Sequence, residues 1–182
     1  LTGEDALALA DEIASILPDG GKRLLTEAGL PVDWNRILAP IPAKFFSDLP
    51  PENRGYHGLI RMRDLWSRGN QLRPAIAATR AVMRLEIKEK GNDHPDTLVQ
   101  LGVLGGLAQR GGQKNEAKEM LHKAYTKLRS RVTGRDLRLA TVAQSLAVLH
   151  VANQDFGQAH PLLEQAYKIR QSHKGLSVAV IS

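Results

Sequence analysis

The chain has 182 residues, which is enough for one domain of ordinary size or for a small domain joined to a short repeat array. Aromatic residues make up only 4% and cysteine is absent, which favours helices packed through small residues and excludes disulfides and thiolate metal sites. The net charge of +6 is uneven, because residues 1–53 carry 4 basic and 9 acidic side chains whereas residues 54–182 carry 21 and 10. No apolar run of 18 residues and no secretory signal occurs, so we expect a cytoplasmic protein that does not span a membrane.

The segment up to residue 53 predicts a small helical module. Thr2 is suited to cap a first helix, and Gly29 is suited to end a second, shorter one. Five prolines follow between residues 31 and 51, and prolines at this density leave room only for short helical pieces. We place these pieces at about 34–38 and 43–49, and we expect the module to pack on the segment that follows it.

From residue 54 to residue 182 the sequence predicts a second, larger part, built on a period of 42 residues. Ala75, Ala117 and Ala159 mark the period, and apolar residues on both sides keep the same spacing. A period in this range is typical of a solenoid, in which each unit buries its apolar face against its neighbours. Turn-forming residues recur at equivalent places, near 69–70, 111–112 and 153–155. We therefore expect three helical hairpins, with helices at about 56–68, 72–89, 97–110, 114–131, 139–153 and 156–172.

Two of the three repeats share a detailed pattern of small and apolar residues. In the second repeat the pattern consists of Leu101, Leu104, Gly105, Ala108, Gly112, Ala117, Leu121 and Ala124. In the third repeat it consists of Ala143, Leu146, Ala147, His150, Gln154, Ala159, Leu163 and Ala166. Together with the segment His94-Pro95-Asp96-Thr97-Leu98 between repeats, this pattern resembles the tetratricopeptide repeat, in particular the 42-residue variety of kinesin light chains and many bacterial regulators. The resemblance implies an all-α fold, with a right-handed solenoid of repeats at about 56–97, 98–139 and 140–176 and the start of a further helix to residue 182.

The two ends of the array depart from the family pattern. The first repeat has Arg63 where a small residue is usual, so we expect it to act as a cap that meets the N-terminal module. The segment after the third repeat is apolar and makes a poor cap, which predicts either a longer protein or self-association through this end. In the N-terminal module, the segment 24–31 resembles the effector-associated and death-like adaptor domains of bacterial signalling and defence proteins.

No catalytic or metal-binding constellation is apparent. None of the six histidines forms a His-x-x-x-His pair, so the helical spacing of zinc ligands is missing. Gly102, Gly105 and Gly106 lack the strand-to-helix context of a phosphate-binding loop, and they indicate either the close approach of a neighbouring helix or ligand, or local sequence drift. We therefore expect a protein without catalytic activity, cofactor or metal.

The resemblance implies that the first helix of each repeat lines a concave groove that binds a protein or peptide partner. Transferring the family's inner positions to this chain gives a partner-binding site of Asp64, Arg68, Val99, Gly102, Gly106, Gln109, Arg110, Thr141, Gln144 and Val148. Arg68 and Arg110 lie 42 residues apart, so they would either form a ladder for the carboxylates of an acidic peptide or be solvated helix ends. The function expected from this groove is that of an adaptor or sensor region in a bacterial regulatory or defence protein.

Two other functions remain open from the sequence. One is a nucleic-acid-binding regulator, whose phosphate contacts would come from Lys123, Lys127, Arg129, Arg131, Arg135 and Arg138. The other is the regulatory arm of an enzyme whose catalytic domain lies outside this chain, an idea prompted by the first residue, which is Leu1 rather than Met.

Overall fold

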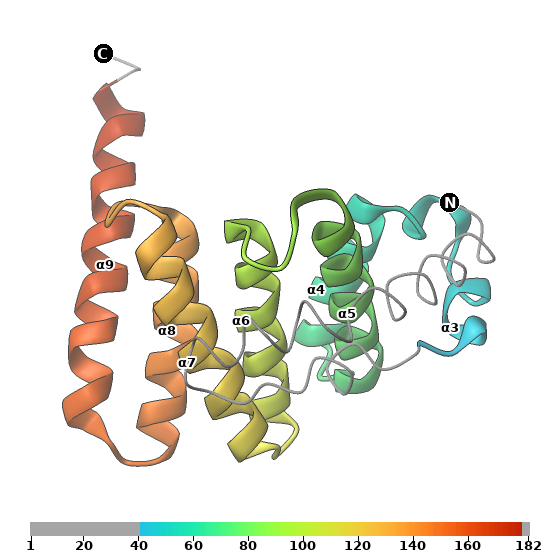
Figure 1. The fold of residues 1–182 in the computed structure, drawn as a ribbon, viewed down its shortest axis with the longest axis horizontal. Helices are drawn as coiled ribbons and strands as arrows, with labels where there is room; N and C mark the ends of the chain where they lie inside the picture. The colour runs from blue at the N-terminus through green and yellow to red at the C-terminus, as the bar shows by residue number, and fades with distance from the viewer. Residues whose placement is uncertain (1–40, 180–182) are drawn as a thin grey trace. The chain divides into compact units, whose positions relative to one another are not determined.

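The computed structural model describes residues 41–179 and shows an all-α architecture in this range (Figure 1). A short helix and a 3-10 turn come first, and no β-strand occurs between residues 41 and 179. The predicted all-α fold class is therefore confirmed, whereas the helices expected before residue 40 lie outside the described residues. The helices are α3 (Ala43–Ser47), η1 (Pro51–Asn53), α4 (Tyr56–Arg68), α5 (Leu72–Lys90), α6 (Pro95–Arg110), α7 (Lys114–Arg131), α8 (Leu137–Ala152) and α9 (Phe156–Ala179).

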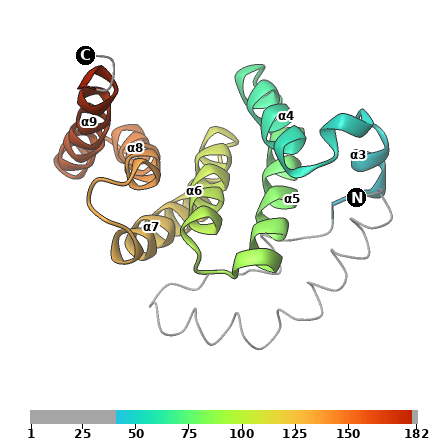
Figure 2. The ribbon, with the colours of Figure 1, turned by 90° about the horizontal axis from the view of Figure 1, so that it is seen from above.

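Successive long helices pack as antiparallel pairs: α4 with α5, α6 with α7, and α8 with α9 (Figures 1 and 2). This order of hairpins is compatible with a helical repeat. The chain divides into two compact units, one ending at Gln100 and the other beginning at Leu101, so that α6 contributes to both. Each unit is therefore described by itself.

The backbone between the two helices of each pair repeats with the 42-residue period. Asn70, Gly112 and Gln154 have positive φ angles of 56°, 81° and 61°. The residue after each of them donates its N–H to a carbonyl five positions earlier: Gln71 to Trp66 at 2.8 Å, Gln113 to Ala108 at 2.9 Å and Asp155 to His150 at 2.9 Å. A left-handed residue combined with this hydrogen bond is the Schellman ending of a helix, which gives donors to the last carbonyls. The periodicity seen in the side chains is thus also present in the backbone.

The small residues that mark the repeat lie where helices approach each other most closely. Ala75, Ala117 and Ala159 are buried, and so are Leu101, Leu104 and Leu107 of α6. A Cβ atom on Gly105 would lie 2.8 Å from Leu121 Cγ of α7, which is too close for a methyl group. Burial of these positions explains why the repeat tolerates only small side chains there.

The first pair of helices is covered by the segment that precedes it. Phe46 and Leu49, at α3 and just after it, pack with Leu59 of α4 and Val82 of α5 in one apolar cluster. The described part of the predicted N-terminal module therefore packs on the first repeat, as expected. Leu65 is 55% exposed although its counterparts in the next two repeats are buried, which agrees with the degenerate character of this repeat.

The last helix is longer than predicted. α9 continues through Gly175 to Ala179, where the sequence analysis placed the start of another helix. No proline interrupts residues 162–179, and a single glycine lowers the stability of a helix by only about 1 kcal/mol. Among the described residues, no helix combines the length and the apolar character needed to cross a bilayer.

Candidate functional site

The predicted groove draws on both units, and the first unit contributes Asp64, Arg68 and Val99. Asp64 pairs with its neighbour Arg63, with 2.8 Å between Oδ1 and Nη2. Arg68 is the exposed last residue of α4, and Val99 is half-buried in α6. The negative end of the helix dipole favours a cation at the last residue of a helix. Arg110 is likewise the last residue of α6, so the helix dipole explains the positions of both arginines without a ligand. The ladder of Arg68 and Arg110 for the carboxylates of a peptide stays a prediction.

In the second unit, the two candidate glycines of α6 lie in different surroundings. A Cβ atom on Gly102 would lie 2.9 Å from Val142 Cγ2 of α8, so this glycine lies at a buried contact between two helices. At Gly106 the nearest atom would be Ser145 Oγ at 3.9 Å, which leaves room beside α6. Of the reasons expected for these glycines, a neighbouring helix accounts for Gly102, whereas Gly106 borders open space. The remaining α6 candidates, Gln109 and Arg110, are half-buried and exposed.

The candidates on α8 lie together on its exposed side. Thr141, Gln144 and Val148 are all exposed, and Val151 continues the same stripe. We call these four residues the α8 surface. The two valines are 49% and 44% exposed, while the other sides of the same helix are buried. The two valines lie one helical turn apart and form a small exposed apolar patch.

One residue of this surface escaped the sequence analysis. Arg170 of α9 donates from Nη2 to Oε1 of Gln144 at 2.6 Å, which brings a guanidinium group to the edge of the α8 surface. The two residues are 26 positions apart and follow no repeat spacing, so no sequence pattern pointed to the pair.

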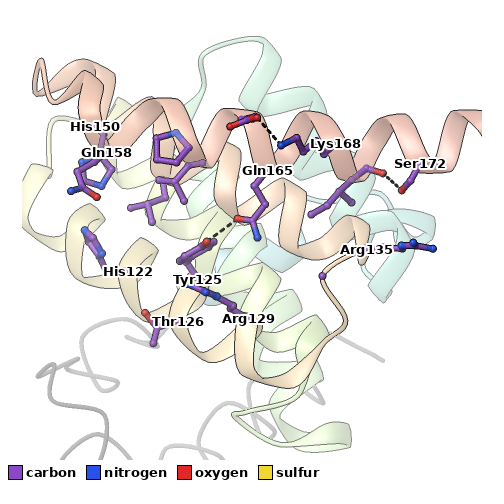
Figure 3. Close-up of a pocket in the computed structure, with 16 residues that line it drawn as sticks. His122, Tyr125, Thr126, Arg129, Arg135, His150, Gln158, Gln165, Lys168 and Ser172 are labelled. Atoms are coloured by element: carbon purple, nitrogen blue, oxygen red, sulfur yellow. Dashed lines mark hydrogen bonds and ion pairs between the residues drawn. The ribbon is translucent and has the colours of Figure 1, made fainter.

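A second feature of the same unit is a cleft between α7 and α9, with α8 at its base (Figure 3). Its volume is about 770 Å³. We call it the α7–α9 cleft. It is lined by His122, Tyr125, Thr126, Arg129, Gly134, Arg135, Leu146, His150, Gln158, Pro161, Leu162, Glu164, Gln165, Lys168, Ile169 and Ser172. None of these residues belongs to the predicted groove.

Two histidines lie at one end of the cleft. His150 Nδ1 lies 3.1 Å from Asp155 Oδ2, and the His122 ring stands edge-on to the His150 ring with 5.5 Å between centroids. Burial, followed by the proximity of His150 and Lys118, lowers the pKa of His122 and so favours the neutral form of this side chain. Its Nε2 atom is buried without a hydrogen-bond partner.

An aspartate–histidine pair invites comparison with a catalytic triad. A triad also needs a nucleophile hydrogen-bonded to the imidazole. The Ser172 hydroxyl at the other end of the cleft donates instead to the carbonyl of Ile169 at 2.7 Å. Ser172 is therefore not positioned as the nucleophile of such a triad.

The basic run that suggested nucleic-acid binding is divided in the structure. Lys123 is buried, and Arg138 is held by Asp136 through Nε at 3.0 Å and Nη2 at 2.7 Å. Arg129, Arg131 and Arg135 are exposed. Three of the six cations are thus exposed, and nucleic-acid binding by this run stays a prediction.

In the first unit, Glu86, His94 and Asp96 bring their potential ligand atoms within 4.8 Å of one another. The ammonium group of Lys90 lies between the carboxylates, 3.0 Å from Glu86 Oε2 and 2.9 Å from Asp96 Oδ2, and these hydrogen bonds raise the pKa of Lys90. Tyr56 donates its hydroxyl to Glu86 Oε1, and burial together with this contact raises its pKa to about 12. A lysine already fills the position that a cation would take, so the cluster ties α5 to α6 rather than forming a metal site.

Neither protein-family models nor curated protein sequences match this chain.

Proposed function

We propose that this protein is a non-catalytic interaction module, and that it binds a peptide segment of a partner protein on the α8 surface. The observation that supports this proposal is the exposure of Val148 and Val151 on a helix whose other sides are buried. An apolar side chain gains about 25 cal/mol for each Å² that a partner removes from water. Two such residues one helical turn apart would bind apolar anchors of a helix or of an extended peptide.

The charges around the α8 surface favour an acidic partner. Arg170 reaches Gln144 from one side, and Arg110 ends α6 in the same unit. Residues 101–182 carry 12 basic and 5 acidic side chains. A peptide with two apolar anchors and at least one carboxylate would complement this surface.

The Schellman helix endings recur every 42 residues, which also supports a more specific assignment to a repeat family. We infer kinship with the tetratricopeptide repeats of the kinesin-light-chain variety, and a role as adaptor or sensor in a bacterial regulatory or defence protein. A cytoplasmic location would agree with the absence of cysteine.

The proposal is tested by selecting peptides from a phage-displayed library of random 12-residue sequences on the full chain. Selected peptides are synthesised and titrated against wild type, Val148→Asp and Leu163→Asp by fluorescence anisotropy. We expect acidic peptides with apolar anchors, and a Kd at least tenfold higher for Val148→Asp, because a charge would replace the apolar contact.

Leu163→Asp is the matched control, because Leu163 is an exposed leucine of α9 that belongs to neither surface. Its Kd should equal that of wild type. Equal losses in both variants, or unchanged binding of every selected peptide to Val148→Asp, would contradict the proposal.

A further inference from the structure

We propose that the α7–α9 cleft is a second binding site, which accepts an acidic peptide segment in extended conformation. The site is distinct from the α8 surface. Leu146 and His150 line the cleft, whereas Val148 belongs to the α8 surface. Residues 146 and 148 point about 200° apart at 100° per residue, so the two surfaces occupy opposite sides of one helix.

The length of the cleft suits an extended chain. Its lining along α9 runs from Gln158 to Ser172, which corresponds to about 20 Å at 1.5 Å per residue. An extended peptide rises about 3.3 Å per residue, so roughly six residues would fill this length. The residues labelled at both ends of the cleft, from His150 to Ser172, mark the same extent in Figure 3.

The lining offers groups for both the backbone and the side chains of a peptide. Tyr125 of α7 donates its hydroxyl to Gln165 Oε1 of α9 at 2.8 Å, midway along the cleft (Figure 3). This bond fixes the amide of Gln165, whose Nε2 hydrogens then serve as donors for a peptide carbonyl. Leu146, Leu162 and Ile169 supply an apolar base for side chains.

The charges of the cleft specify the acidic character of the ligand. Glu164 is the only acidic residue in the lining, and Lys168 neutralises it at 2.7 Å and lowers its pKa. Arg129 and Arg135 add two exposed cations, with Arg129 beside Tyr125 and Arg135 at the end opposite the histidines (Figure 3). His173 Nε2 lies 2.8 Å from the carbonyl of Arg135, and this hydrogen bond ties the loop that carries the arginine to α9. Arginines at two points along a trough are suited to pair with carboxylate side chains of a bound segment.

Other ligand classes fit these observations less well. Single-stranded nucleic acid would need aromatic side chains exposed for stacking, but Tyr125 is half-buried and hydrogen-bonded across the cleft. Small ligands bind in pockets that bury most of their surface, whereas this trough is largely open to solvent.

The experiment uses the full chain and the 12-residue phage library described above. Peptides selected on wild type are titrated against three variants: Arg129→Glu/Arg135→Glu, Val148→Asp and the charge-matched control Lys88→Glu/Lys114→Glu. Both control lysines are exposed and lie outside the cleft, and circular dichroism checks that every variant keeps its helix content. We expect one class of acidic peptides whose Kd rises at least tenfold in the Arg129→Glu/Arg135→Glu variant and is unchanged in the other two.

The possible outcomes separate the two proposals. A class of peptides that responds only to Val148→Asp, with none that responds to the arginine variant, would overturn the cleft site and leave the proposed function standing. If every selected peptide responded to the arginine variant and none responded to Val148→Asp, the cleft site would be supported and the α8 surface contradicted. Equal weakening by the lysine control would show a general charge effect, and the absence of any selected peptide would also overturn the cleft site.

Discussion

At the scale of single residues, the three glycines of α6 look alike in the sequence and differ in the structure. A methyl group on Gly105 would lie 2.8 Å from Leu121 Cγ and 3.2 Å from Met120 Cβ. A methyl group on Gly106 would meet only Ser145 Oγ, at 3.9 Å. The repeat pattern identified Gly105 as a position for a small residue, but it could not tell which of its neighbours had space beside it, because this depends on the partner helix.

This contrast predicts opposite effects for the same substitution at adjacent positions. Gly105→Ala should lower the free energy of unfolding by about 1–3 kcal/mol, because α7 must shift to admit the methyl group. Gly106→Ala should raise it by roughly 0.5–1 kcal/mol, because alanine restricts the unfolded chain without a clash. Urea unfolding followed by circular dichroism measures both values. Changes of the same sign in the two variants would contradict the close contact between α6 and α7 at Gly105.

At the scale of elements, the helix boundaries could largely be predicted from the sequence. The expected helix at 56–68 coincides with α4, and the expected helix at 114–131 coincides with α7. Periodic apolar residues and turn residues at a fixed interval determine such boundaries locally. The contacts between helices could not be predicted, since pairs such as Tyr125–Gln165 and Arg170–Gln144 depend on how helix faces meet.

The Schellman endings lead to a prediction for the connection between α8 and α9. Gln154 has a φ of 61°, a conformation that costs a residue with a side chain about 1–2 kcal/mol, whereas glycine adopts it readily. Gly112 occupies the equivalent place at a φ of 81°. Gln154→Gly should therefore raise the free energy of unfolding by about 1 kcal/mol, and Gly112→Ala should lower it by a similar amount. Both residues are exposed, so changes in side-chain packing do not affect the comparison of the two variants. Thermal unfolding would measure the change in stability of each variant. Destabilisation by Gln154→Gly would contradict the assigned backbone conformation.

At the scale of the whole molecule, each unit buries its apolar surface through near neighbours in the sequence. In the first unit, α3 covers α4 and α5 through Phe46, while in the second unit α8 and α9 pack on each other. Stability in such an arrangement is approximately a sum of local terms, so the loss of one contact is felt mainly by the helices that share it. The candidate surfaces both lie in the second unit, and we expect them to persist when the first unit is weakened.

Phe46→Ala tests this locality. Phe46 is 6% exposed, and removal of a buried phenylalanine ring costs about 3–5 kcal/mol through lost burial and the remaining cavity. We expect faster hydrogen exchange for the amides of α4 and α5 and unchanged exchange for those of α8 and α9. Phe156→Ala makes the same chemical change at a residue that is 63% exposed, and it should leave exchange nearly unaltered in α4 and α5. If Phe46→Ala instead accelerated exchange equally in all helices, the chain would unfold as one cooperative body, and stability would not be a sum of local terms.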